Sequence, residues 1–153
     1  MNKEEVLSHL RVAKAAHISW VQRAKLLIEG FTINETSIPV NSTECQFGQW
    51  FYSEGQKLND IRNNPISSMQ EIESLHFKLH DVYLNIYKIY YDLEKKSFLS
   101  KVFGKKKKVS EEDKLRAKEY YKEMDAISQE LVKALNIMER RIGVVNDDEI
   151  TSL

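Results

Sequence analysis

Two histidines four residues apart carry the clearest chemical signal in this sequence. His76 and His80 lie in a segment whose apolar residues recur at helical spacing, so both rings project from one face of a helix. Such a pair can bind one metal ion. Because both residues lie next to the apolar columns, we expect their rings to point into the interior of a helix bundle.

One further histidine and the single cysteine can complete a metal shell. His17 occupies a core position in the N-terminal helical segment, and Cys45 is expected in the first turn of another helix. There the helix dipole lowers the pKa of a thiol and favours the thiolate. Three helices can therefore direct one thiolate and three imidazoles to one point, which is a suitable tetrahedral shell for zinc. His9 lies off the apolar stripe, and we expect it on the surface.

Each of these residues also has a purely structural interpretation. Taken singly, His17 is more often a hydrogen-bonded core histidine, and Cys45 a small buried apolar side chain. What favours the metal site is their joint occurrence, because the only cysteine and three of the four histidines fall on inward or helix-start positions.

The first two expected helices carry His17 and Cys45. A stripe of apolar spacing runs through the first 31 residues, at Val6, Leu10, Ala13, His17, Trp20, Ala24, Leu27 and Phe31. A loop over residues 32–43 follows. The second helix is expected to begin near Ser42 or Thr43, with Thr43–Gln46 as a capping box, and to end at Asn63-Asn64-Pro65.

The other two expected helices carry the strongest periodicity. A capping box over Ser68–Glu71 is expected to open a helix with columns at Ile72, Leu79, Ile86 and Leu93 and at Leu75, Val82 and Ile89. Ser110 caps a last helix over residues 110–142, with Gly143 as its C-terminal stop and a loose tail over 146–153.

These elements predict an all-α fold over residues 1–153, without a sheet or a second domain. We expect a four-helix bundle, in which the long C-terminal helix either completes the bundle or is an additional element. The length of 153 residues is enough for a hydrophobic core without disulfides.

Composition excludes several functions. The 23 basic and 23 acidic residues balance, so a nucleic-acid-binding surface is not expected. One cysteine cannot form an intramolecular disulfide, which fits a reducing, cytoplasmic location. Neither a membrane-spanning apolar run nor a signal peptide is visible. Lys105–Lys108 could touch an anionic membrane surface, but a solvated loop is the favoured interpretation.

The motifs resemble those of the chemoreceptor zinc-binding (CZB) family of bacterial regulatory domains. The resemblance covers roughly residues 5–94 and rests on three elements: His17-Ile18-Ser19-Trp20, Cys45-Gln46-Phe47-Gly48-Gln49-Trp50-Phe51 and His76-Phe77-Lys78-Leu79-His80. It implies a four-helix bundle that binds one Zn²⁺ through His17, Cys45, His76 and His80, usually as a homodimer.

The resemblance also implies a role in signalling. Family members lie in the cytoplasm beside chemoreceptor or diguanylate cyclase modules and regulate them. Their signal is zinc itself, or oxidation of the zinc-bound cysteine by an oxidant such as hypochlorous acid. This sequence shows no output module, so we expect a chemoreceptor or cyclic-dinucleotide signalling protein as a partner in trans. Oxidation of Cys45 would weaken one ligand and loosen one helix, provided that an oxidant can reach the sulfur.

Three alternatives compete with a zinc sensor. A zinc hydrolase needs a glutamate directly after the first histidine, where this chain has Phe77, so no enzyme is expected. A di-iron bundle needs two Glu-x-x-His motifs, and only Glu73-Ser74-Leu75-His76 is present. The more serious alternative is a metal-independent helical dimerisation or interaction module, which the columns of Ile72–Leu93 and Tyr120–Ile142 could also serve.

Overall fold

The described part of the chain, in a computed structural model, comprises residues 1–62, 66–91 and 109–153. Its helices are α1 (Lys3–Ile28), α2 (Gln46–Phe51), the 3₁₀ helix η1 (Glu54–Asp60), α3 (Ile66–Tyr90), α5 (Glu111–Val144) and α6 (Asp147–Thr151). No strand occurs in these three ranges, and the expected all-α fold is confirmed. Leu93 and the Lys105–Lys108 run lie outside them.

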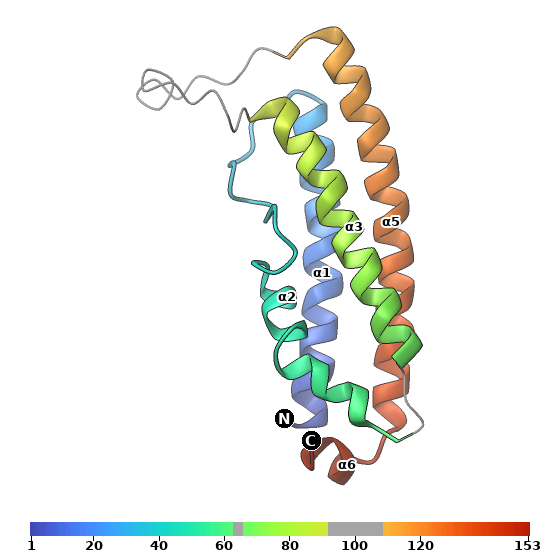
Figure 1. The fold of residues 1–153 in the computed structure, drawn as a ribbon. Helices are drawn as coiled ribbons and strands as arrows, with labels where there is room; N and C mark the ends of the chain where they lie inside the picture. Colours follow the sequence, from blue (N-terminus) through green and yellow to red (C-terminus); the bar gives the residue numbers. More distant parts are fainter. Residues whose placement is uncertain (63–65, 92–108) are drawn as a thin grey trace.

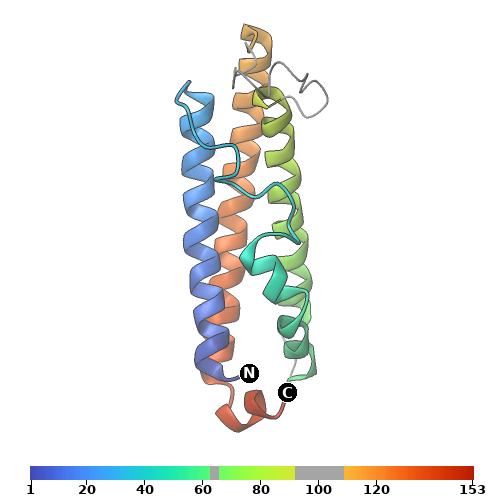
Figure 2. The ribbon, with the colours of Figure 1, turned by 90° about the vertical axis from the view of Figure 1, so that its left-hand side faces the viewer.

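Three long helices form the body of the molecule, and α1 and α3 both pack along α5 (Figure 1). The short pair α2 and η1 lies beside α1 and takes the place of a fourth long helix (Figure 2). The C-terminal helix α5 therefore completes the bundle. The expected second helix is broken into two short pieces around Tyr52 and Ser53.

The apolar stripe of α1 forms one wall of the core, as its spacing predicts. Val6, Leu10, Ala13, His17, Trp20, Ala24 and Leu27 are all buried. Phe31 is the exception, with 59% of its surface exposed. The helix ends at Ile28, and Gly30 turns the chain with a φ of 96°, so the helical spacing no longer sets where residue 31 points.

The columns of α3 and α5 face each other across the same core. Ile72, Leu79 and Ile86 are buried in α3, and Leu131, Leu135, Met138 and Ile142 are buried in α5. These buried residues pack within the chain and are not available to an intermolecular coiled coil, whereas Leu75, Tyr120 and Ile127 of the same columns are only partly buried.

Two of the expected helix ends are wrong, and one is confirmed. Ser68 does not cap α3 but lies inside it, where its hydroxyl accepts a hydrogen bond from Arg141 of α5. Gly143 is the penultimate residue of α5 rather than its stop, since nothing there requires a left-handed residue. The cap predicted at Ser110 is confirmed, because its hydroxyl accepts from the backbone N–H of Asp113 at 3.1 Å.

The tail is also more ordered than its sequence indicates. Residues 147–151 form α6, capped by Asn146, and Ile150 is fully buried. α6 lies at the same end of the bundle as the N-terminus and contacts α1 (Figure 1). The tail sequence is mostly polar, but burial of this one isoleucine side chain stabilises α6 against the bundle.

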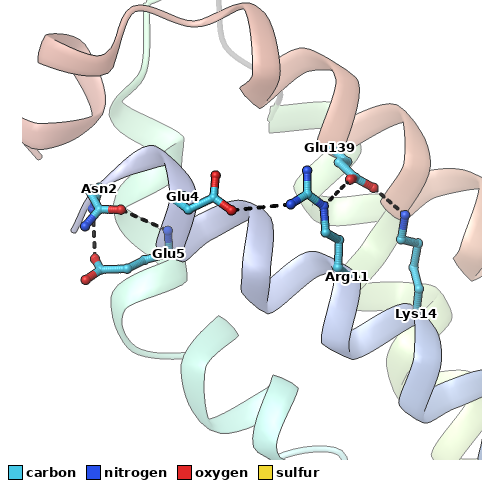
Figure 3. A network of polar contacts seen from close by, with 6 residues as sticks. All are labelled: Asn2, Glu4, Glu5, Arg11, Lys14 and Glu139. Atoms are coloured by element: carbon cyan, nitrogen blue, oxygen red, sulfur yellow. Dashed lines mark hydrogen bonds and ion pairs between the residues drawn. The ribbon is translucent and has the colours of Figure 1, made fainter.

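A polar network joins α1 to α5 on the surface (Figure 3). Glu139 accepts from Arg11 Nε at 2.7 Å and also pairs with Lys14. At the start of α1, Asn2 and Glu5 form a capping box. The contacts of Arg11 and Lys14 with Glu139 hold α1, and therefore His17, against α5 in one register.

Within the described ranges, no helix combines the length and the apolar character needed to cross a membrane.

Candidate metal centre

Cys45 is positioned by the backbone at the start of α2. It is the N-cap of this helix, and its sulfur accepts from the backbone N–H of Gly48 at 3.2 Å. The thiol lies 3.3 Å from the carbonyl oxygen of Ser42, to which it donates. The helix therefore begins at Gln46, later than expected, and the predicted capping box at Thr43 does not form, because the cysteine itself supplies the cap.

The other three predicted residues come from the two helices on either side of α2. His17 projects from α1, and His76 and His80 project from α3, all with at most 2% of their surface exposed. One ring nitrogen of each histidine and the Cys45 sulfur lie within 4.8 Å of one another. The structure thus brings together all four residues that the sequence singles out.

Two close contacts define the centre of this cluster. His76 Nε2 lies 3.2 Å from Cys45 Sγ and 3.1 Å from His80 Nε2. A tetrahedral zinc ion with Zn–N bonds of about 2.1 Å would separate its nitrogen ligands by about 3.4 Å. The two contacts are slightly shorter than that value, and no two of the four donor atoms are more than 4.8 Å apart, so the donors could hold a zinc ion after small shifts.

The outer ring nitrogens of two histidines are anchored to backbone carbonyls. His17 Nδ1 lies 2.6 Å from Ala13 O, and His80 Nδ1 lies 2.8 Å from Pro39 O. A carbonyl can only accept, so each Nδ1 carries the proton and each Nε2 presents a lone pair to the cluster. This arrangement is typical of metal-binding histidines.

Two buried polar atoms of the cluster have no hydrogen-bond partner. They are His17 Nε2 and His76 Nδ1. An unsatisfied buried nitrogen costs free energy unless a ligand binds it. A cation between the four donors would satisfy His17 Nε2, and this is the strongest sign in the structure that the cluster is built for a metal.

The electrostatics of the site favour neutral imidazoles. Burial lowers the pKa of His17 to about 4, against the hydrogen bond to Ala13, which raises it. Burial and the neighbouring His17 and His80 lower the pKa of His76 to about 2, and burial also lowers the pKa of His80. Near neutral pH all three rings are therefore unprotonated on one nitrogen and able to bind a metal.

The expectation of a lowered thiol pKa is wrong for the protein without metal. Burial raises the pKa of Cys45, and the backbone N–H groups of Gly48, Phe47 and Cys45 itself oppose it only in part. The site is buried, and the dipole of the six-residue helix α2 does not compensate the thiolate for its lost hydration. A bound divalent cation deprotonates a coordinating thiol outright.

The cluster lies in the middle of the bundle, surrounded by aromatic rings. His17 is near the midpoint of α1, and its ring packs edge-on against Trp20 and Phe47 at centroid distances of 4.5 and 5.9 Å. Cys45 has 1% of its surface exposed. An oxidant therefore has no open path to the sulfur in this conformation.

Residues outside the cluster complete the description. His9 is half-buried rather than at the surface, because its ring stacks on Trp50 of α2 at 4.6 Å. Glu73 is exposed and lines a shallow surface pocket of about 420 Å³ with Tyr52 and Phe77, so it is not one of the clustered donors. The carbonyls of Ala13 and Pro39 could not have been found from sequence, since every residue carries one.

Comparison with known proteins identifies a related family. The family model of the chemoreceptor zinc-binding domain (CZB) matches residues 17–87, a range that begins at His17 and includes Cys45, His76 and His80. No curated protein and no solved structure matches the chain.

Proposed function

Because residues 17–87 place this chain in the chemoreceptor zinc-binding domain family, we propose that it is a zinc-binding regulatory protein. His17, Cys45, His76 and His80 would hold one zinc ion. The observation that carries the proposal is the buried cluster of four donor atoms within 4.8 Å, with outer hydrogen bonds that aim two lone pairs inward.

The donor set supports a regulatory rather than a catalytic role. Three nitrogens and one sulfur fill a tetrahedral shell and leave no position for a substrate or an activated water. The cluster contains no carboxylate that could serve as a general base. We therefore propose that the protein has no catalytic activity of its own.

The signal is zinc supply or an oxidant that reacts with Cys45. Hypochlorous acid transfers its oxygen to the thiolate, so that a sulfenic acid and chloride form. The sulfur loses two electrons and the chlorine gains them. Sulfenic acid is a poorer ligand than thiolate, so both signals end in a weakened or empty site. Because metal binding contributes to folding, that loss changes the packing of α2 against α1 and α3.

We further propose that the protein acts in the cytoplasm as a homodimer and regulates a partner in trans. A chemoreceptor or a cyclic-dinucleotide signalling protein is the class of partner that the family indicates. The alternative of a metal-independent interaction module retains only the outer surface, where Val12, Ile18 and Leu26 of α1 are exposed, because the columns of α3 and α5 face the core.

Metal analysis of the purified protein tests the proposal. Wild type and His9→Ala, which lies outside the cluster, should each contain one zinc per chain, and Cys45→Ala and His80→Ala should contain far less. Equal zinc in all four proteins would remove the cluster as the site. A wild type that takes up no zinc would favour the interaction module.

Hypochlorous acid treatment separates the two signals. A chromogenic chelator should detect zinc release from the oxidised wild type. If zinc stays bound after Cys45 has been oxidised, the redox signal is wrong and zinc supply remains.

A further inference from the structure

The segment that joins α1 to α2 is hydrogen-bonded to residues of the metal cluster. We call residues 32–44 the strap. It runs along the outside of the bundle across α1 and α3 (Figures 1 and 2). We propose, on the basis of the proposed zinc site, that the strap is a latch: metal at the cluster holds residues 36–44 against α3, and metal loss releases them.

One end of the strap is attached to α3 by tyrosines far from the cluster. Tyr91 donates from its hydroxyl to Ile33 O at 3.2 Å, and Tyr87 donates to the carboxylate of Glu35. Neither tyrosine takes part in the donor cluster. These contacts hold the closed strap against α3 without touching the donor cluster.

The other end is attached by His80 of the cluster. His80 donates from Nδ1 to Pro39 O at 2.8 Å, a bond that is compatible with metal on the other ring nitrogen, whereas the bond from the Cys45 thiol to Ser42 O at 3.3 Å requires the protonated sulfur of the metal-free site. The same imidazole faces the cluster with Nε2. A metal on Nε2 fixes the plane of the ring and so fixes the position of Nδ1–H beneath Pro39.

The strap has little structure of its own to resist release. It contains no helix or strand, and its backbone bonds are local turns such as Ser37 N to Asn34 O at 3.0 Å. From α1 it receives a hydrogen bond from Arg23 to Ser37 O at 2.7 Å, made by an exposed side chain. Apart from the buried Ile38, the strap is held mainly by side chains of other elements, and such a segment opens locally when those side chains move.

Opening would expose two groups that are covered in the closed form. Ile38 of the strap and the Cys45 sulfur next to Ser42 each belong to residues with 1% exposure. Transient opening of the strap would give a small oxidant access to the sulfur, and the release that follows metal loss would present Ile38 to a partner. The latch thereby links a site in the middle of the bundle to its outer surface.

Coupling between zinc binding and closure of the strap is reciprocal, so it can be tested by a substitution that is not at a metal ligand. If zinc holds the strap closed, a weakened strap must lower zinc affinity by the same factor. Tyr87→Phe removes the hydroxyl that holds Glu35. Tyr90→Phe is the matched control. Tyr90 is a buried tyrosine of the same helix, but the charge that acts on the pKa of its hydroxyl is that of Lys114 in α5.

The experiment combines hydrogen exchange with zinc titration on the full chain. Removal of zinc by a chelator should speed amide exchange of residues 36–44 at least about tenfold, with smaller changes in residues 125–140 of α5. Tyr87→Phe should lower zinc affinity about three- to tenfold, the value of one hydrogen bond, and Tyr90→Phe should not.

Each result decides between the two proposals. A chain that binds no zinc overturns both the zinc site and the latch. A chain that binds one zinc, but whose strap exchanges at the same rate with and without it, overturns the latch alone. Equal zinc affinity in Tyr87→Phe and Tyr90→Phe also overturns the latch.

Discussion

Gly48 and Ser42 touch through their backbones: a Cβ placed on Gly48 would lie 1.7 Å from the carbonyl oxygen of Ser42. No side chain fits at that distance. Gly48 also supplies the N–H that binds the Cys45 sulfur. The glycine therefore lets α2 lie against the end of the strap and fixes the cysteine at the cluster.

Gly48→Ala should abolish or greatly weaken zinc binding, because the added methyl group must push α2 away from Ser42 and move Cys45. Zinc stoichiometry and thermal unfolding followed by circular dichroism measure the effect. Gly143→Ala is the control, since its Cβ would meet open space in α5, and it should raise stability by up to about 1 kcal/mol. Wild-type zinc affinity in Gly48→Ala would contradict this account of the close contact.

Zinc binding should change the fluorescence of Trp20 rather than of Trp50. The Trp20 ring lies 4.5 Å from His17 and 5.4 Å from His80, centroid to centroid, so it senses the charge that a metal places on both imidazoles. Titration of zinc into metal-free protein should alter the emission of wild type and of Trp50→Phe. Trp20→Phe should lose the change, and the opposite pattern would place the metal elsewhere.

Glu139→Gln should destabilise the bundle at neutral pH by no more than about 1 kcal/mol, as expected for a partly exposed ion pair. Hydrogen bonds from Lys14 and Arg11 hold the pKa of Glu139 below its usual 4.5 (Figure 3). Its contribution is therefore complete above about pH 4.5 and is lost as the pH falls through the lower folded-state pKa.

Urea unfolding at pH 7 and at successively lower pH checks this sign. The difference between Glu139→Gln and wild type should shrink below pH 4.5. Glu130→Gln serves as the control, because Glu130 pairs with Lys133 of its own helix and both side chains are largely exposed. A difference that grows as the pH falls would contradict the assignment.

Ile150→Ala should lower stability by about 2 kcal/mol or more, since a fully buried isoleucine side chain leaves a cavity when truncated. Chemical unfolding of the variant beside Val144→Ala measures the loss. Val144 is 86% exposed, so its truncation should change little. Equal stabilities would mean that α6 does not dock against α1 in solution.

The members of the cluster and the cores of the helices could be predicted from sequence, because both signals are local. A buried residue every three or four positions marks the inner face of α1, which holds His17, and of α3, which holds His76 and His80. Helix ends were predicted less well. Ser68 and Gly143 have the residue types of caps, but packing against α5 and the absence of a local turn place them inside helices.

The sequence by itself determined which side chains face the core and which donor types, one thiol and three imidazoles, are available to a metal. Only the tertiary structure decided that their donor atoms lie within 4.8 Å of one another, and that the thiol pKa is raised rather than lowered. The physical reason is the distance along the chain over which each effect acts. Periodicity records the faces of one helix, whereas the register between helices, the desolvation of Cys45 and the contact of His80 with Pro39 depend on segments distant in the chain.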